Sequence, residues 1–178
     1  SELSVMLNRS KLIAFAFAVL PWMAMSSAHA DAPSFEVFAK GNSLAFSSHD
    51  ATPLNTGLTL SAGQAFSITA TGLWNGGACG DIDANGTGCF GTEGTTGINY
   101  YSLIGRIGSA PTYDNQWFKI GTSYSGVAAT SGTLFLAYLD SDSFNNSGSV
   151  VATVTSVPEP ASALLLGLGL VPLLLRRR

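Results

Sequence analysis

Short runs of alternating apolar and polar residues, separated by turn residues, dominate the middle of this chain. Residues 35–39, 65–71 and 149–155 all alternate in this way, which is the period of a β-strand with one buried face. No ten-residue window shows apolar residues at helical spacing. Glycine, serine, threonine and asparagine fill the connections. The pattern predicts an all-β fold, an antiparallel β-sandwich of about eight strands.

One run has no polar face. Residues 133–139 are apolar at every position but the first, so we expect a strand covered on both sides, with the second sheet on one of them. Either a loop or a second copy of the chain covers the other side, and the second case would make the protein a homo-oligomer. Residues 57–60 and 65–71 flank a turn at 61–64 and predict a hairpin.

The first 30 residues have the composition of a targeting segment. Arg9 and Lys11 precede an apolar run at residues 12–20, and a small-x-small pattern ends at Ala30. This order predicts a secretory signal peptide that begins at Met6 and is cut after Ala30 by signal peptidase.

The last 22 residues form a second targeting segment. An uncharged run over residues 161–175 lies between a short motif and three arginines, which predicts an apolar helix that stops in a membrane. The motif reads Val157, Pro158, Glu159, Pro160. This order resembles the PEP-CTERM sorting signal of Gram-negative bacteria. The resemblance implies transient insertion into the inner membrane, removal of residues 157–178 by an exosortase-type protease, and export to the periplasm, outer surface or extracellular matrix.

Residues 31–156 remain between the two targeting segments, a length that suits one domain with a real core. They carry nine acidic side chains and three basic ones. Because phosphate binding needs clustered Lys and Arg, this balance argues against a nucleic-acid partner. Cations and neutral polar ligands fit this acidic charge balance better than nucleic acid does.

Two cysteines, Cys79 and Cys89, lie in the exported segment. In an oxidising compartment such a pair predicts a disulfide, which stabilises the fold by roughly 2–3 kcal/mol. A zinc site is the alternative, but His49 is the single histidine left after signal cleavage, and zinc sites draw on four ligands.

A polar loop at residues 140–148 is the first candidate metal site. Asp140, Asp142, Asn145 and Asn146 place two carboxylates and two carboxamides between two strands, and Ca²⁺ takes six to eight such oxygen ligands. The alternative is an ordinary turn, because Asp, Asn, Ser and Gly are also turn residues.

A second acidic loop imitates the start of an EF-hand. Asp81, Asp83 and Asn85 have the required spacing, but position twelve is Thr92 instead of the closing glutamate. A polar loop without metal and a weaker second Ca²⁺ site both remain open.

The domain also resembles the calcium-dependent galactose-binding bacterial lectins of the PA-I type. The similarity runs in order through residues 103–108, 118–121 and 132–136 to Asp140 and the Asn145-Asn146 pair. It implies a lectin-like, jelly-roll type of β-sandwich in which Asp140, Asn145 and Asn146 bind Ca²⁺ and the ion binds two sugar hydroxyls.

The chain departs from that family in two places. The loop between Asp140 and Asn145 is two residues shorter, so the resemblance implies a carbonyl ligand from Ser143 or compensation by Asp142. A further carbonyl ligand is expected just after Trp74, with Asn75 as the nearest candidate. The family's sugar-contacting His-Pro pair has no counterpart here, so a galactose preference is not implied.

Trp74 has two interpretations. An aromatic face suits the C–H side of a pyranose, so Trp74 is a candidate sugar platform beside Asn75, Asp140 and Asn145. It could equally cap the core.

We expect no catalysis. His49 stands alone, and no Gly-x-Ser-x-Gly elbow occurs. The predicted function is Ca²⁺-dependent binding of exopolysaccharide or surface glycan. A structural matrix protein without sugar binding is the second hypothesis, and a secreted glycan hydrolase that uses a carboxylate pair is the third.

Overall fold

The computed structural model describes residues 32–45, 52–86, 90–111 and 114–156. These ranges contain nine β-strands and no α-helix, which confirms the all-β prediction with one strand more than the approximate count. The strands are β1 (Ser34–Phe38), β2 (Ser43–Ala45), β3 (Leu54–Leu60), β4 (Ala65–Asn75), β5 (Leu103–Gly108), β6 (Phe118–Lys119), β7 (Ser123–Val127), β8 (Gly132–Asp140) and β9 (Ser147–Ser156).

Several predictions made from the sequence fall outside these ranges. The signal peptide with its cleavage site after Ala30, residue His49 and the motif from Val157 to Pro160 are among them. Cys89 lies outside as well, so the Cys79–Cys89 disulfide stays a prediction. Across the described ranges, no helix combines the length and the apolar character needed to cross a membrane.

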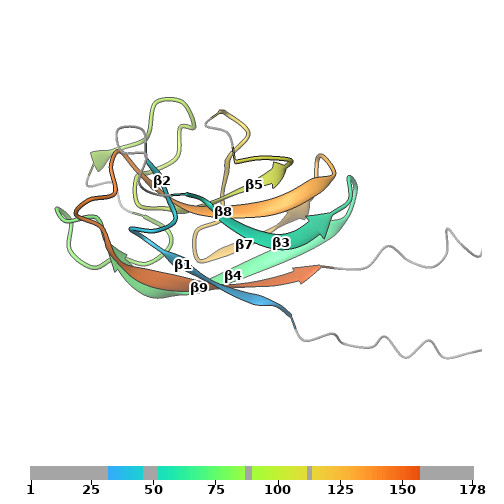
Figure 1. Ribbon diagram of the computed structural model, residues 1–178, viewed down its shortest axis with the longest axis horizontal. Helices are drawn as coiled ribbons and strands as arrows, with labels where there is room; N and C mark the ends of the chain where they lie inside the picture. The colour runs from blue at the N-terminus through green and yellow to red at the C-terminus, as the bar shows by residue number, and fades with distance from the viewer. Residues whose placement is uncertain (1–31, 46–51, 87–89, 112–113, 157–178) are drawn as a thin grey trace, which may run out of the picture. The chain divides into compact units, whose positions relative to one another are not determined.

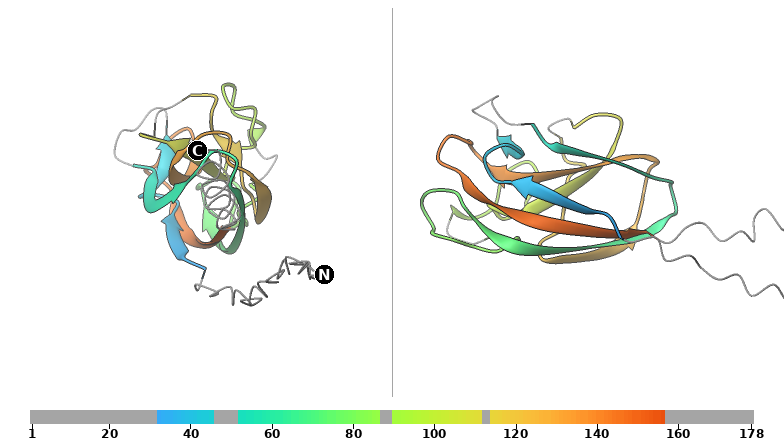
Figure 2. Two further views of the ribbon diagram at one scale, coloured as in Figure 1. Left: turned by 90° about the vertical axis from the view of Figure 1, so that its right-hand side faces the viewer. Right: turned by 60° about the horizontal axis from the view of Figure 1, so that its bottom comes forward.

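The strands form two sheets that face each other as a sandwich (Figure 1). The first sheet has the order β1-β9-β4-β7, and all its pairs are antiparallel. Its two long strands, β4 and β9, run side by side along the sandwich (Figure 2). The second sheet has the order β2-β8-β5-β6, with β3 also paired to β8.

Two details correct the predicted topology. β2 runs parallel to β8, so the sandwich is not wholly antiparallel. β3 and β4 do not form a hairpin, because β3 pairs with β8 while β4 lies in the other sheet. The turn at residues 61–64 therefore joins the two layers. Alternation reveals which face of a strand is buried, but it contains no information on the pairing partner.

The main core lies between the sheets. The apolar positions of β4 and β9 point inward as predicted, and they meet the inner face of β8. Full burial of a Val, Leu, Ile or Phe side chain contributes about 1.5–3 kcal/mol. This core includes Phe66, Ile68, Ala70, Leu134, Leu136, Tyr138, Val150, Ala152 and Val154.

A second apolar cluster covers the outer face of β8. Phe135, Ala137 and Leu139 point away from the main core and pack with Leu44, Ile98, Ile104 and Trp117. The chain itself thus covers both faces of β8, as one of the two hypotheses expected. The feature that suggested a homo-oligomer no longer supports one.

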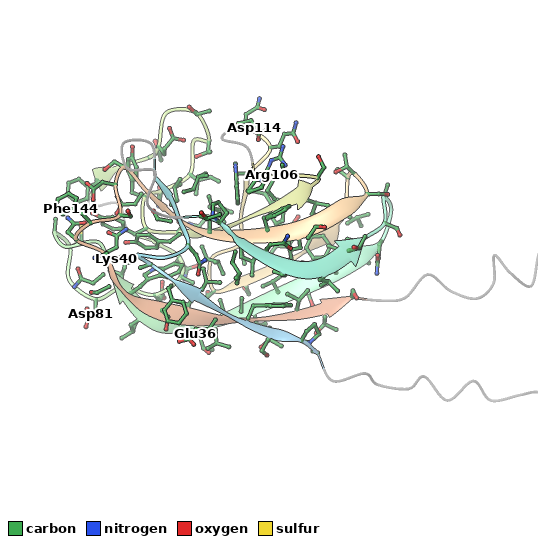
Figure 3. The ribbon with its side chains drawn as sticks, viewed as in Figure 1. Glu36, Lys40, Asp81, Arg106, Asp114 and Phe144 are labelled. Atoms are coloured by element: carbon green, nitrogen blue, oxygen red, sulfur yellow. The ribbon has the colours of Figure 1, made fainter. Side chains whose placement is uncertain are left out.

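A buried arginine holds the segment that carries Trp117. Arg106 on β5 pairs with Asp114 at 2.8 Å and donates to the carbonyl of Ala110. The two side chains lie together in Figure 3. The hydrogen bond from Arg106 lowers the pKa of Asp114.

We expect Trp117→Ala to lower the free energy of unfolding by about 3–5 kcal/mol, because its side chain is buried and a cavity would remain. Urea denaturation measures the loss. Val127→Ala on the exposed edge of β7 is the control and should cost less than about 0.5 kcal/mol. A small loss for Trp117→Ala would show that the second cluster does not stabilise β8.

Candidate functional site

The connection between β8 and β9 forms one end of the sandwich. Asp140 is the last residue of β8, and residues 141–146, hereafter the β8–β9 loop, lead into β9. This loop lies at the left end in Figure 1, whereas β1 begins and β9 ends on the right. The described chain therefore enters and leaves the domain at the end opposite this loop.

A pocket of about 320 Å³ opens beside the loop. Its walls come from the segment after β4, the segment before β5 and the β8–β9 loop. Asp140, Asp142 and Asn145 line it. The structure thus brings these three predicted metal-site residues to one cavity, hereafter the β8–β9 pocket.

Three carboxylate and carboxamide oxygens at this end of the sandwich are buried and have no hydrogen-bond donor among the described residues. They are Oδ2 of Asp140, Oδ1 of Asp142 and Oδ1 of Asn146. Buried acceptors without a partner are rare and cost about 1–3 kcal/mol each, more when charged. An oxygen-only set that contains two carboxylates is the chemistry that hard cations bind.

The remaining polar atoms of the loop hold it in shape. Asp140 Oδ1 accepts a hydrogen bond from the Ser141 N–H at 2.6 Å. The Nδ2 group of Asn146 donates to the Asp142 carbonyl at 3.0 Å and to the Ala39 carbonyl at 3.3 Å. The Asn146 amide is therefore anchored through its nitrogen, which leaves its oxygen as the unused acceptor.

The pocket raises the pKa of two of its titratable residues, Asp140 and Tyr101. Burial raises the pKa of Asp140 to about 6, against the lowering effect of Ser141 and Asn146, and the nearby Asp142 raises it further. Burial and then Asp140 also raise the pKa of Tyr101 to about 12. Each shift disfavours negative charge, as expected where carboxylates lack a counter-cation.

Trp74 belongs to the core, which corrects its assignment as a sugar platform. Its side chain is 1% exposed, and its Nε1–H donates to the Tyr101 carbonyl at 3.0 Å. The ring packs edge-on against Tyr138 at a centroid distance of 4.5 Å. Neither ring face is accessible to a ligand. Of the two interpretations, the core cap is the one this structure supports.

The two residues expected to supply carbonyl ligands, Asn75 and Ser143, are not among the described residues that line the pocket. The Asn75 side chain donates to Asp81 and accepts from Gly77 N–H, and Asn75 does not line the pocket. Gly76 lines it instead. The Ser143 carbonyl accepts a hydrogen bond from Asn146 N–H at 3.3 Å, and Ser143 is outside the pocket lining.

The EF-hand-like loop is held by its own hydrogen bonds. Asp83 accepts from the N–H of Asn85, and the Asn85 side chain binds Thr122. Glu93, one residue past the expected closing position, caps the N–H groups of Thr95 and Thr96. These contacts favour the polar loop without metal. No group of three or more His, Cys, Asp or Glu side chains in the described ranges is arranged to hold a metal ion.

Sequence reasoning missed the aromatic part of the pocket. Phe90, Tyr100 and Tyr101 line it, and all three precede β5. Tyr101 adopts a φ of 69°, a conformation uncommon for residues other than glycine. No pattern in the sequence signals this backbone geometry.

The comparisons with known proteins concern the tail and the fold. Residues 156–178 match the model of the PEP-CTERM protein-sorting motif. The chain therefore carries the predicted sorting signal, which marks it for export and sorting to the cell envelope. None of the curated proteins compared with the sequence matches it. The structure is similar to a solved structure described as "EclA N-terminal domain; PllA-like lectin", with a TM-score of 0.45 and 24% identity over 70% of this chain and 95% of the other.

Proposed function

We propose that the protein is an exported, envelope-associated glycan-binding protein that acts without catalysis and uses Ca²⁺ bound at the β8–β9 pocket. The observation that carries the proposal is the set of three buried, unpartnered acceptors on Asp140, Asp142 and Asn146. Such a set is costly unless a cation binds it.

The residue types support the choice of ion. Asp140 and Asp142 would supply the charge, Asn146 an amide oxygen, and Asn145 stands on the pocket wall. Since Ca²⁺ takes six to eight oxygens, positions remain for water and for a ligand. When bound, the ion supplies a positive centre at which vicinal hydroxyls of a sugar replace water.

The cellular location of the protein supports the same function. The sorting motif at residues 156–178 directs the protein to the cell envelope, where exopolysaccharide, surface glycan and external Ca²⁺ are available. Exosortase-type processing would then remove the tail. The described strands enter and leave the domain at the end opposite the pocket.

Calorimetric titration of the purified protein with CaCl₂ tests the proposal. We expect one Ca²⁺ per chain, and at least a hundredfold weaker binding in Asp142→Asn, because a charged ligand is replaced by a neutral one. Asp81→Asn, in the EF-hand-like loop, is the matched control and should bind as the wild type does.

Two different results would contradict the proposed Ca²⁺ site. No binding at millimolar Ca²⁺ would overturn the proposed site and leave a structural surface protein as the better hypothesis. Loss of binding in Asp81→Asn with normal binding in Asp142→Asn would move the site to the other loop.

A further inference from the structure

Three exposed apolar side chains lie together on the outer face of the first sheet. Phe38 on β1, Leu73 on β4 and Val151 on β9 are 49%, 57% and 42% exposed. The sheet order β1-β9-β4 makes these strands neighbours. Single exposed apolar residues are ordinary on a protein surface, whereas a cluster of them marks a contact surface. These three residues are hereafter called the apolar patch.

The strand register arranges the patch around one serine. Phe38 and Leu73 both pair with Ser149, from opposite sides of β9. These three residues form a row that crosses the strands, and Val151 lies two residues further along β9 on the same face. Alternate residues of each strand fill the core, so the side chains of the row and of Val151 point away from it.

The outer face carries little charge, although the domain is acidic. Of the four strands in the described first sheet, only β1 contains a charged residue, Glu36. Its Oε1 accepts a hydrogen bond from the Ser149 hydroxyl at 2.7 Å, which holds the carboxylate beside the patch. Ala39 is buried, so strand alternation returns the exposed Lys40 to the outer side (Figure 3). One acid and one base thus flank Phe38 on the same face.

This arrangement is complementary to itself. A two-fold axis along the row from Phe38 to Leu73 brings each residue of the row opposite its own counterpart in a second copy. Glu36 and Lys40 lie two residues before and two residues after Phe38. The same axis therefore brings Glu36 of each copy opposite Lys40 of the partner subunit. A strongly acidic or basic partner would find no matching charge on this face.

We propose that the protein forms a two-fold symmetric dimer through the outer face of the first sheet, with the apolar patch at the centre and two Glu36–Lys40 ion pairs beside it. Burial of the patch drives the association, and the ion pairs fix the register of the two copies. This contact is separate from the outer face of β8, which the chain itself covers.

Sedimentation equilibrium of the purified full chain in a density-matched detergent tests the patch. We expect a reversible dimer in the micromolar range, and Phe38→Ser should weaken it at least about tenfold. Phe144→Ser removes an exposed phenylalanine from the β8–β9 loop and is the matched control, which should dimerise as the wild type does. Both variants should keep the urea midpoint of the wild type, because both side chains are exposed.

Charge reversal tests the two-fold axis. Glu36→Lys and Lys40→Glu should each weaken the dimer roughly tenfold, because each change converts both ion pairs into like-charge contacts. The double variant that carries both reversals should return to within about threefold of the wild type, because opposite charges face each other again. A role of Glu36 within its own subunit would not be rescued by Lys40→Glu.

A wild type that stays monomeric at millimolar concentration would overturn the proposal. A dimer unaffected by Phe38→Ser would place the contact on another face or on the terminal segments and would overturn it equally. Single charge reversals without rescue in the double variant would refute the two-fold arrangement. Phe38→Ser should bind Ca²⁺ with unchanged affinity, so failure of the dimer and failure of the Ca²⁺ site are separate results.

Discussion

Replacement of Asp140 by asparagine is expected to make the calcium-free protein more stable at neutral pH and to abolish its stabilisation by Ca²⁺. Asp140 is 4% exposed, and one of its carboxylate oxygens has no donor in the described part of the chain. Burial raises its pKa from 3.8 to about 6. Because each pKa unit corresponds to about 1.4 kcal/mol, the charged form opposes folding by about 2–3 kcal/mol.

The pH dependence follows from the direction of this shift. A raised pKa means that the folded state holds the proton more tightly than the unfolded state does. In the absence of Ca²⁺, the contribution of Asp140 to stability is therefore neutral below about pH 4, becomes unfavourable as the pH rises to about 6, and stays constant above that value. Asp140→Asn should remove this dependence.

Differential scanning calorimetry of the wild type and Asp140→Asn between pH 4 and 7.5, with and without Ca²⁺, measures both effects. The wild type should gain about 4 kcal/mol at a free Ca²⁺ concentration a thousandfold above its Kd, and the variant should gain nothing. Asp81→Asn should behave as the wild type does. If Asp140→Asn destabilises the calcium-free protein at pH 7, the hydrogen bonds within the fold already outweigh the cost of the buried charge, and the cation site is refuted.

Truncation of Trp74 to alanine is expected to lower the free energy of unfolding by about 3–5 kcal/mol, a loss large enough to prevent folding of a marginal domain. The side chain is 1% exposed, donates to the Tyr101 carbonyl and packs against Tyr138. Both a cavity and an unpartnered carbonyl would result.

Trp74→Phe keeps the experiment informative if the alanine variant does not fold. It retains an aromatic ring but loses the Nε1–H donor, so we expect a loss of about 1–2 kcal/mol in urea denaturation. Sugar affinity per folded molecule should stay within twofold of the wild type. A large loss of affinity with little loss of stability would restore Trp74 as a sugar contact.

The strands were readable from sequence because burial on one face imposes a period of two. Phe66, Ile68 and Ala70 on β4 alternate in burial as their pattern predicted, as does the apolar side of β9. The uniform run on β8 likewise predicted cover on both faces. Trp117 and Ile98 pack on the outer face of β8, and both come from segments distant in the sequence. The periodicity of a strand cannot predict which distant residues will pack against it.

The candidate site also has some features that the sequence predicted and others that it did not. Asp140, Asp142 and Asn145 occur within one short loop, so their presence at one end of the sandwich followed from the sequence. The unpartnered oxygens of Asp140, Asp142 and Asn146 did not, because that property depends on where the hydrogen-bond donors of the folded chain lie. The assignment of Trp74 failed because an aromatic residue near a loop has the same sequence signal whether it faces the solvent or the core.

The sequence alone determined the local properties of this protein: alternating strands, an acidic domain poor in basic residues, a polar loop after β8 and a sorting tail. These properties arise from residue type and near-neighbour spacing. The tertiary structure decided which strands pair across the layers, which aromatic ring is exposed and which carboxylate is buried. Phe90 is exposed and Trp74 is buried for this reason, since solvent exposure is set by contacts between segments far apart in the chain.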